Sequence, residues 1–303
     1  MSDILAVFTQ NILPILIVAT FGFALQRTYQ IDKRALSSIV FNCLGPCLVF
    51  TSLVKSQLPG EELLQLMAFA IVSLLGMGVL GWLLARGLRF SRMETAAFLV
   101  VVIFVNGGNF GLTLNQLRYG DAGLARAIVF YMVNTFLAYT LGVFIASSGE
   151  LSARQALARL GKLPAVYAAV LAIIVYSFAI PLPAPLLRGL EIAGSGAIPV
   201  MLVILGMQIA DLRGGLSWRL ALPAVSVRLL LGPVMGLLVA TVLGLQGLSR
   251  STSIIEASMP TAVFTIILAT EFGLQPAIVT GIVVVSTLLS PLTIATTITL
   301  LGL

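Results

Sequence analysis

Histidine is absent from this chain of 303 residues, and charged residues make up only 9% of it. Soluble domains carry about 25% charged residues, so little of this surface is built to face water. Without histidine, the commonest metal ligand and general base is missing. The only cysteines, Cys43 and Cys47, lie four positions apart in one apolar run. That spacing strains a disulfide on a helix and supplies too few metal ligands, so we expect no metal and no cofactor.

Apolar sequence is what the chain has in abundance. Hydrophobic residues make up 59% of it, and its mean hydropathy is +1.11. These values predict an all-α integral membrane protein embedded in a lipid bilayer. The net charge of +6 does not indicate a nucleic-acid partner, because the basic residues are divided among short separate loops.

Hydropathy averaged over about 19 residues predicts ten membrane-spanning helices joined by short connections. Their expected positions are residues 4–25, 36–54, 63–85, 94–117, 122–147, 163–181, 191–210, 219–245, 254–272 and 276–301. Eleven lysines and arginines fall after the first, third, fifth and seventh spans, against five after the second, fourth, sixth and eighth. The positive-inside rule therefore places the first group of loops in the cytoplasm and both termini outside.

Two of these spans contain residues that a simple membrane anchor would avoid. The fourth and ninth spans carry, respectively, Asn106, Gly107, Gly108, Asn109 and Gly111, and Met259, Pro260 and Thr261. Weakened helix at membrane depth is tolerated only where it faces protein or a water-filled cavity. Interrupted apolar segments in corresponding positions of two halves indicate a transport site.

An internal repeat supports this interpretation. A shift of 153 positions places Pro46 on Pro199, Asn106-Gly107 on Met259-Pro260, and Tyr119-Gly120 on Phe272-Gly273. Five spans per repeat is an odd number, so the two halves, residues 1–153 and 154–303, must lie in the membrane with opposite orientation. Inverted repeats with broken helices are typical of transporters, and we expect the fourth and ninth helices to cross at their breaks.

The residue types at the two breaks suit an anionic substrate. A broken helix exposes free N–H groups and a partial positive charge where its second half begins. Asn106 and Asn109 can donate hydrogen bonds to a carboxylate, and the three glycines allow close approach to the backbone. Pro260 enforces the second break. The alternative interpretation is that these are packing glycines and a proline kink, both common in membrane helices.

Four further polar side chains lie inside predicted spans. A central arginine such as Arg228 costs at least about 2.5 kcal/mol, so it needs a partner; helix-end carbonyls or an acid are favoured over a substrate anion. Glu256, four residues before Pro260, is a candidate proton site, a partner for Arg228 or an interfacial residue. Gln208 and Asn134 fit interhelical hydrogen bonds better than ligand contacts.

The sequence resembles the auxin efflux carrier family of permeases along nearly its whole length. The most specific segments are Asn106–Leu112, Tyr139–Leu141, Arg228 with Gly232-Pro233, and Ser258–Ala262. The chain departs from the plant carriers in lacking a long central loop, which favours a bacterial inner-membrane member. It also has Val105 where those carriers place a proline before the asparagine.

The resemblance implies a fold similar to that of the bile acid–sodium symporters. It further implies a scaffold domain of helices 1, 2, 6 and 7 and a transport domain of helices 3–5 and 8–10. Substrate would bind at the crossover of helices 4 and 9, with an elevator-type movement and a homodimer formed through the scaffold. The position of Asn106 matches the crossover asparagine that is thought to hold auxin in the plant carriers.

We therefore expect a secondary transporter of a small organic carboxylate anion and not an enzyme. Proton or sodium coupling stays open, because Glu256 is the only acid near a break. A uniporter is the other possibility, since one charge gains about 2.3 kcal/mol per 100 mV of membrane potential. An anion channel or an intramembrane enzyme is a weaker alternative, the second because no catalytic constellation can be assembled.

Overall fold

The computed structural model describes residues 2–56, 58–147, 164–210 and 217–303, and all regular elements within them are helical. The α-helices are α1 Ser2–Val7, α2 Leu13–Tyr29, α3 Lys33–Ile39, α4 Gly45–Ser56, α5 Gly60–Gly87, α6 Arg92–Ile103, α7 Thr113–Leu137, α8 Val143–Ala146, α10 Pro164–Ser177, α11 Ala184–Ser195, α12 Ala197–Ala210, α13 Trp218–Ser226, α14 Gly232–Val242, α15 Gly247–Ala257, α16 Phe264–Phe272 and α17 Pro276–Leu301. The π-helical segments are η1 Phe8–Ile12, η2 Val40–Leu44, η3 Gly107–Leu112, η4 Ala138–Gly142 and η5 Val227–Leu231.

Seven helices in this part of the chain are long and apolar enough to cross a membrane. They cover Ile4–Tyr29, Lys33–Ser56, Gly60–Gly87, Gly107–Ala146, Ala184–Ala210, Trp218–Val242 and Pro276–Leu301. The prediction of an all-helical membrane protein is confirmed. The count of ten spans in two inverted repeats stays a prediction. The repeat boundary and four of the basic residues used for the orientation lie outside the described residues, these being Arg154, Arg159, Lys162 and Arg213.

Prolines explain three of the five π-helical segments. Pro14, Pro46 and Pro233 each occupy the second position of the α-helix that follows η1, η2 and η5, respectively. A proline has no N–H to donate, and its ring clashes with the carbonyl of the preceding turn. A single wider turn before the proline accommodates both effects while the helix continues.

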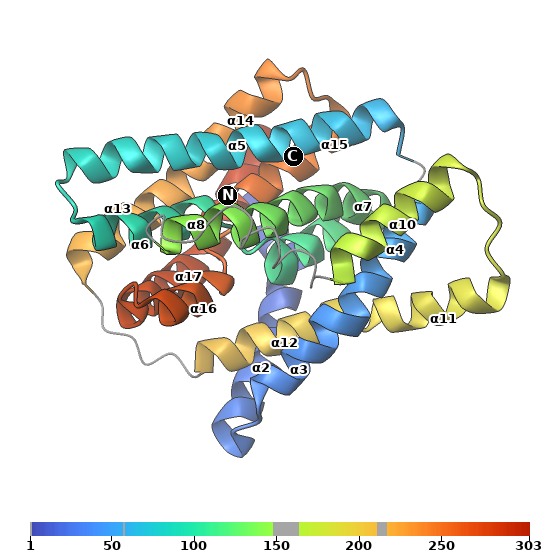
Figure 1. Ribbon diagram of the computed structural model, residues 1–303, viewed down its shortest axis with the longest axis horizontal. Coiled ribbons are helices and arrows are strands. Elements are labelled where there is room, and N and C mark those ends of the chain that lie inside the picture. Colours follow the sequence, from blue (N-terminus) through green and yellow to red (C-terminus); the bar gives the residue numbers. More distant parts are fainter. Residues whose placement is uncertain (1, 57, 148–163, 211–216) are drawn as a thin grey trace.

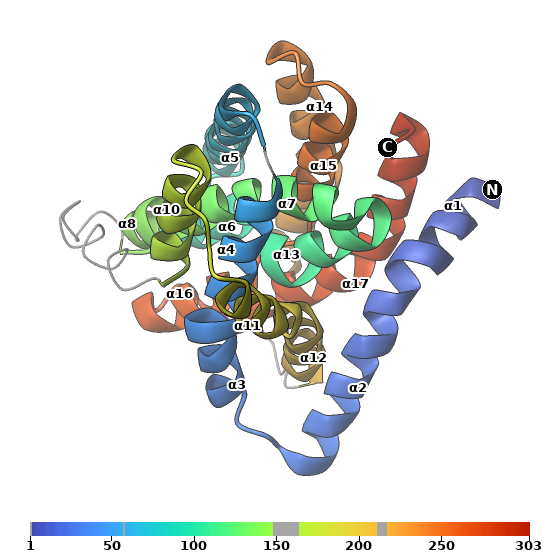
Figure 2. The same cartoon turned by 90° about the vertical axis from the view of Figure 1, so that its right-hand side faces the viewer.

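The helices pack in two groups, which Figures 1 and 2 show from perpendicular directions. In the first group, α2 packs along α12, and α4 packs against α10 and α11. In the second, α5 packs against α6, α7, α14 and α15, while α17 packs against α13 and α16. Contacts of α12 with η3 and of α4 with α7 join the groups. The segment η3 therefore lies at the boundary between them.

The contact between α2 and α12 is unusually close. A Cβ atom on Gly22 would lie 2.0 Å from the carbonyl oxygen of Val203, and one on Gly206 would lie 1.7 Å from that of Ala19. Small residues at such contacts let two helix backbones approach within a membrane. This pair of helices therefore forms a tightly packed part of the first group.

Two helices in the second group are interrupted in the middle. The first interruption follows α6, where Phe104–Asn106 leave the helix before η3 begins and continues into α7. The second separates α15, which ends at Ala257, from α16, which begins at Phe264. The glycine-rich stretch is therefore the start of the second half-helix, and the break itself lies just before it.

Both interrupted helices are followed by a glycine with positive φ. Gly120, which bends α7, has φ of 63°, and Gly273, which follows α16, has φ of 68°. Left-handed backbone favours glycine because it has no Cβ atom. These two glycines are the pair that the shift of 153 positions superimposes, so the match extends to a positive φ, whereas ψ differs, at −155° for Gly120 and 24° for Gly273.

Candidate functional site

The two interrupted helices cross each other at their breaks. Val105 and Thr261 form an isolated antiparallel bridge. The N–H of Asn106 donates to the carbonyl oxygen of Pro260 at 2.8 Å, and the N–H of Ala262 donates to that of Phe104 at 2.9 Å. Backbone polar groups that the helices leave unpaired at membrane depth thus satisfy each other, as such groups must in a dry interior.

Neighbouring helices hold this crossover through side chains. Asn134 of α7 accepts from the N–H of Val105 at 3.3 Å and donates to its carbonyl oxygen at 3.1 Å. The hydroxyl of Thr261 donates to the carbonyl oxygen of Val101 at 2.9 Å. The N–H of Thr261 donates to the hydroxyl of Ser286 in α17 at 3.3 Å. Asn134 and Thr261 therefore bind protein groups here, and both are buried.

Arg228 connects the two helix ends that stop at the crossover. Its Nη1 donates to the carbonyl oxygen of Val102 in α6 at 2.8 Å, and its Nη2 donates to that of Ala257 in α15. The side chain is 1% exposed. The carbonyl end of a helix carries partial negative charge, so one guanidinium compensates two such ends. Of the partners considered for Arg228, the helix-end carbonyls are the ones it contacts.

The asparagines of the first break have unused hydrogen-bonding capacity. Asn106 is 5% exposed, and its Nδ2 has no hydrogen-bond partner in the described structure. An unpaired buried donor costs about 1–3 kcal/mol, so such groups are rare unless they serve a function. Asn109, in the first turn of η3, is half-buried; its carbonyl oxygen accepts from the hydroxyl of Thr113, and its side chain forms no hydrogen bond within the described part of the chain.

Glu256 fills the space that two of the glycines leave. The carboxyl group is fully buried; its Oε1 accepts from Nδ2 of Asn115 at 3.1 Å, and its Oε2 has no partner among the described residues. A Cβ atom on Gly107 would lie 2.7 Å from Oε2, and one on Gly111 would lie 2.5 Å from both oxygens. These two glycines thus face a carboxyl group of the protein.

The remaining predicted site residues have different surroundings. A Cβ atom on Gly108 would lie 2.9 Å from the ring of Tyr131. Met259 and Pro260 are buried within the crossover itself. Gln208 lies on α12, the helix of the first group that packs against η3, and its Oε1 is buried without a partner. The interhelical hydrogen bond expected of Gln208 stays a prediction.

Asn115 and Ser286 belong to the site but did not stand out in the sequence. Asn115 is fully buried and donates both to Glu256 and to the carbonyl oxygen of Gly111, the latter at 3.0 Å. The sequence did contain an indication of Asn115, because this polar residue lies one helical turn after Gly111 in an apolar run. Ser286 sits among many serines and threonines of apolar helices, so nothing in its neighbourhood distinguishes it.

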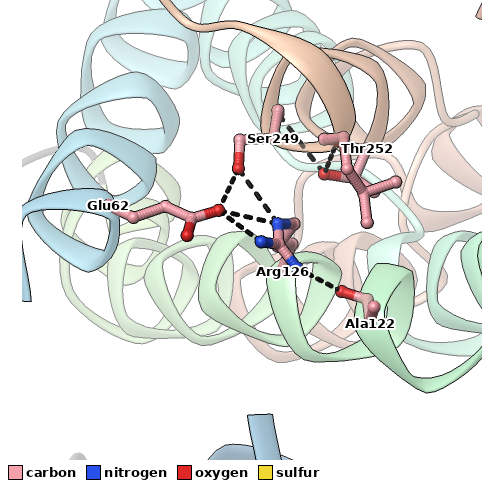
Figure 3. A network of polar contacts seen from close by, with 6 residues as sticks. Glu62, Ala122, Arg126, Ser249 and Thr252 are labelled. Atoms are coloured by element: carbon pink, nitrogen blue, oxygen red, sulfur yellow. Dashed lines mark hydrogen bonds and ion pairs between the residues drawn. The ribbon is translucent and has the colours of Figure 1, made fainter. Parts of the chain in front are cut away.

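A second polar cluster lies away from the crossover (Figure 3). Glu62, at the start of α5, accepts from Nε of Arg126 in α7 at 2.7 Å and from the hydroxyl of Ser249 in α15. Nε of Arg126 also donates to that hydroxyl at 3.0 Å. The cluster joins three helices of the second group and is partly open to solvent.

Comparison with known proteins agrees with this architecture. A profile described as membrane transport protein matches residues 7–155 and 149–298, which is almost the whole chain. The chain belongs to the membrane transport protein family. The resemblance to auxin efflux carriers is thereby confirmed, and the protein is a membrane transporter with several membrane-crossing helices.

Two curated relatives of the transporter come from archaea. One is an uncharacterized transporter of Methanothermobacter thermautotrophicus, 28% identical over 298 residues, which cover 93% of this chain and 94% of the relative. The other is an uncharacterized transporter of Methanocaldococcus jannaschii, 25% identical over 271 residues, covering 86% and 87% of the two chains. Both relatives are described only as uncharacterized transporters.

Proposed function

We propose that the transporter carries a small organic anion that binds at the crossover of α6–η3 with α15–α16. The observation that carries this proposal is the buried Nδ2 of Asn106, a hydrogen-bond donor without a partner at the start of η3. A carboxylate there would accept from Asn106 and from the free N–H groups of the first turn. Asn109, half-buried in the same turn, supplies a further donor.

The electrostatics of the crossover support an anion over a cation. Four half-helix ends come together there, two of them negative and two positive. Arg228 compensates the negative ends, because it donates to the last turns of both α6 and α15. The starts of η3 and α16 keep their partial positive charge. The site can therefore favour an anion without any charged side chain contacting it.

The two packing groups supply the parts of an elevator-type mechanism. In this proposal the group of α1–α4 and α10–α12 is the scaffold, and the group of α5–α8 and α13–α17 moves with the substrate. In this proposal Gln208 is a scaffold residue, because it lies on α12, the helix that packs against η3. A homodimer through the scaffold, a location in the bacterial inner membrane and termini outside complete the proposal.

The test is charge movement measured on a solid-supported membrane with purified protein in liposomes. The panel contains indole-3-acetate, malonate and malate, each with and without sodium and at two pH values. We expect a saturable anion current that Asn106→Ala abolishes, while the variant stays folded and inserted. Asn42→Ala is the matched control, because Asn42 is an exposed asparagine of η2 that donates only within its own helix. Normal transport by Asn106→Ala would refute the crossover site, and non-saturable flux would indicate a channel.

A further inference from the structure

Glu256 has an incomplete set of partners for a fully buried acid. Asn115 supplies its one hydrogen bond, and Oε2 has none. The basic side chains on neighbouring elements are engaged elsewhere: Arg228 at two carbonyl oxygens and Arg126 at Glu62 and Ser249. Within the described residues, no lysine or arginine pairs with this carboxyl group.

The chemistry around the carboxyl group points to a proton as its ligand. An ionised carboxylate without a cation is very costly in a protein interior, and a proton removes that cost. Asn115 has already donated its amide hydrogens to Gly111 and Glu256, and its Oδ1 is a second buried acceptor without a partner. A proton on Oε2 would convert one of two unpaired acceptors into a donor.

The position of Glu256 links this proton to the anion site. Its carboxyl oxygens lie against Gly107 and Gly111, in the first turn and a half of η3. A negative charge on Glu256 therefore faces the same helix start that the proposed function assigns to the substrate. Two anions at one helix start repel each other, so bound substrate favours the protonated acid. By linkage, protonation then favours substrate binding equally.

We propose that Glu256 takes up one proton with each substrate anion, so that the transporter works as a proton–anion symporter. This inference rests on the proposed function and adds its coupling ion. The groups that contact Glu256 from the packed elements are Asn115 on α7 and Gly107 and Gly111 of η3; the ring of Tyr131 on α7 lies against Gly108, and Arg228 reaches the adjacent Ala257. Glu62 on α5 and Arg126 on α7 form an ion pair with each other near the start of α15. A monovalent anion such as indole-3-acetate would then move without net charge. In the liposome measurement only the divalent anions malonate and malate would therefore give a current, and transport of indole-3-acetate would be followed as uptake of the labelled substrate.

Binding of indole-3-acetate to the purified full-length protein in detergent tests the coupling. In the wild type we expect affinity to fall by up to about tenfold per pH unit above the range where Glu256 is protonated. A pH dye in weakly buffered solution should record proton uptake on binding. Glu256→Gln should bind with the acid-state affinity at every pH and take up no proton.

Two controls separate this inference from the proposed function. Glu62→Gln removes another acid of the same packing group and should keep the wild-type pH dependence. Asn106→Ala should lose binding at every pH, which would leave the site correct even if Glu256→Gln behaved like the wild type. An unchanged pH dependence in Glu256→Gln, or binding that needs sodium instead of acid, would overturn the inference.

A spectroscopic measurement needs no substrate. The infrared difference spectrum between acid and alkaline samples should contain the C=O stretch of a protonated carboxylic acid. This band should disappear in Glu256→Gln and persist in Glu62→Gln. A spectrum in which Glu256→Gln removes no such band would mean that Glu256 does not exchange a proton, and the inference would fail.

Discussion

Arg228 and Glu256 are both buried beside the same crossover, 1% and 0% exposed, yet they differ in their hydrogen-bond partners. Arg228 donates to two helix-end carbonyls from two different helices. Glu256 has one amide partner and an oxygen with none. The arginine thus holds the crossover together, whereas the glutamate stays in a position where gaining or losing a proton changes the local charge. Burial alone does not distinguish these roles: both terminal nitrogens of Arg228 bridge two helix ends and only its Nε is unpaired, whereas Glu256 has a single amide partner.

The largest effect is expected when the well-partnered charge is removed. Arg228→Met abolishes two charge-assisted hydrogen bonds and leaves the carbonyl ends of α6 and α15 uncompensated. At about 1.5 kcal/mol or more for each bond, the loss should reach about 3 kcal/mol. Denaturant titration in mixed micelles measures this loss in the free energy of unfolding. We expect the stability of Arg228→Lys to lie between those of Arg228→Met and wild type, because one ammonium group cannot reach both carbonyl oxygens as a guanidinium does. Equal stability of Arg228→Met and wild type would contradict a binding role for this arginine.

A smaller effect is expected from crowding the poorly partnered acid. In Gly111→Ala the new methyl group would lie 2.5 Å from the carboxyl oxygens of Glu256. Overpacking of this kind costs about 1–3 kcal/mol. Gly87→Ala is the control, because a Cβ atom there would meet nothing within 4 Å.

The double variant Gly111→Ala with Glu256→Ala shows whether the cost arises at this contact. Shortening Glu256 removes the atoms that the methyl group meets, so the two changes together should cost less than their sum. Thermal unfolding of the four proteins of the cycle gives the coupling. Additive changes would mean that Gly111 is required for another reason.

The crossover contains both what the sequence could predict and what it could not. Composition predicted the membrane class, and local breakers such as Pro260 predicted interruptions in two particular spans, because both are properties of neighbouring residues. The need of Arg228 for a partner also followed from its position in an apolar run. These are short-range arguments, and the structure agrees with them.

The exact place of the first break was not predictable in the same way. Phe104 and Val105 are apolar residues like those before them, and they leave the helix because they pair with the segment around Thr261. The contact of Gly111 with Glu256 likewise joins residues far apart in the chain. Such partners are set by how the helices pack, which no local pattern records. The glycines were predicted to let a ligand or the partner helix approach the backbone, but not which residue of that helix two of them would meet, which is Glu256 of α15.

The smallest change in stability is expected at Glu62, an acid that is paired and partly exposed. Glu62 forms an ion pair with Arg126 at 2.7 Å, with the two side chains 20% and 18% exposed. Glu62→Gln should lower stability by up to about 1 kcal/mol, and the loss should shrink at high salt.

Glu256→Gln makes the same chemical change at the unpaired acid and should leave stability unchanged or raise it. The amide keeps an acceptor for Asn115 and removes a carboxylate that no cation compensates. Melting temperatures of both variants, measured side by side at low and high salt, test this opposite behaviour. If Glu256→Gln were the more destabilised of the two, its carboxylate would have a partner that holds the fold together. Glu256 would then stabilise the crossover as Arg228 does, and the contrast between these two residues would not hold.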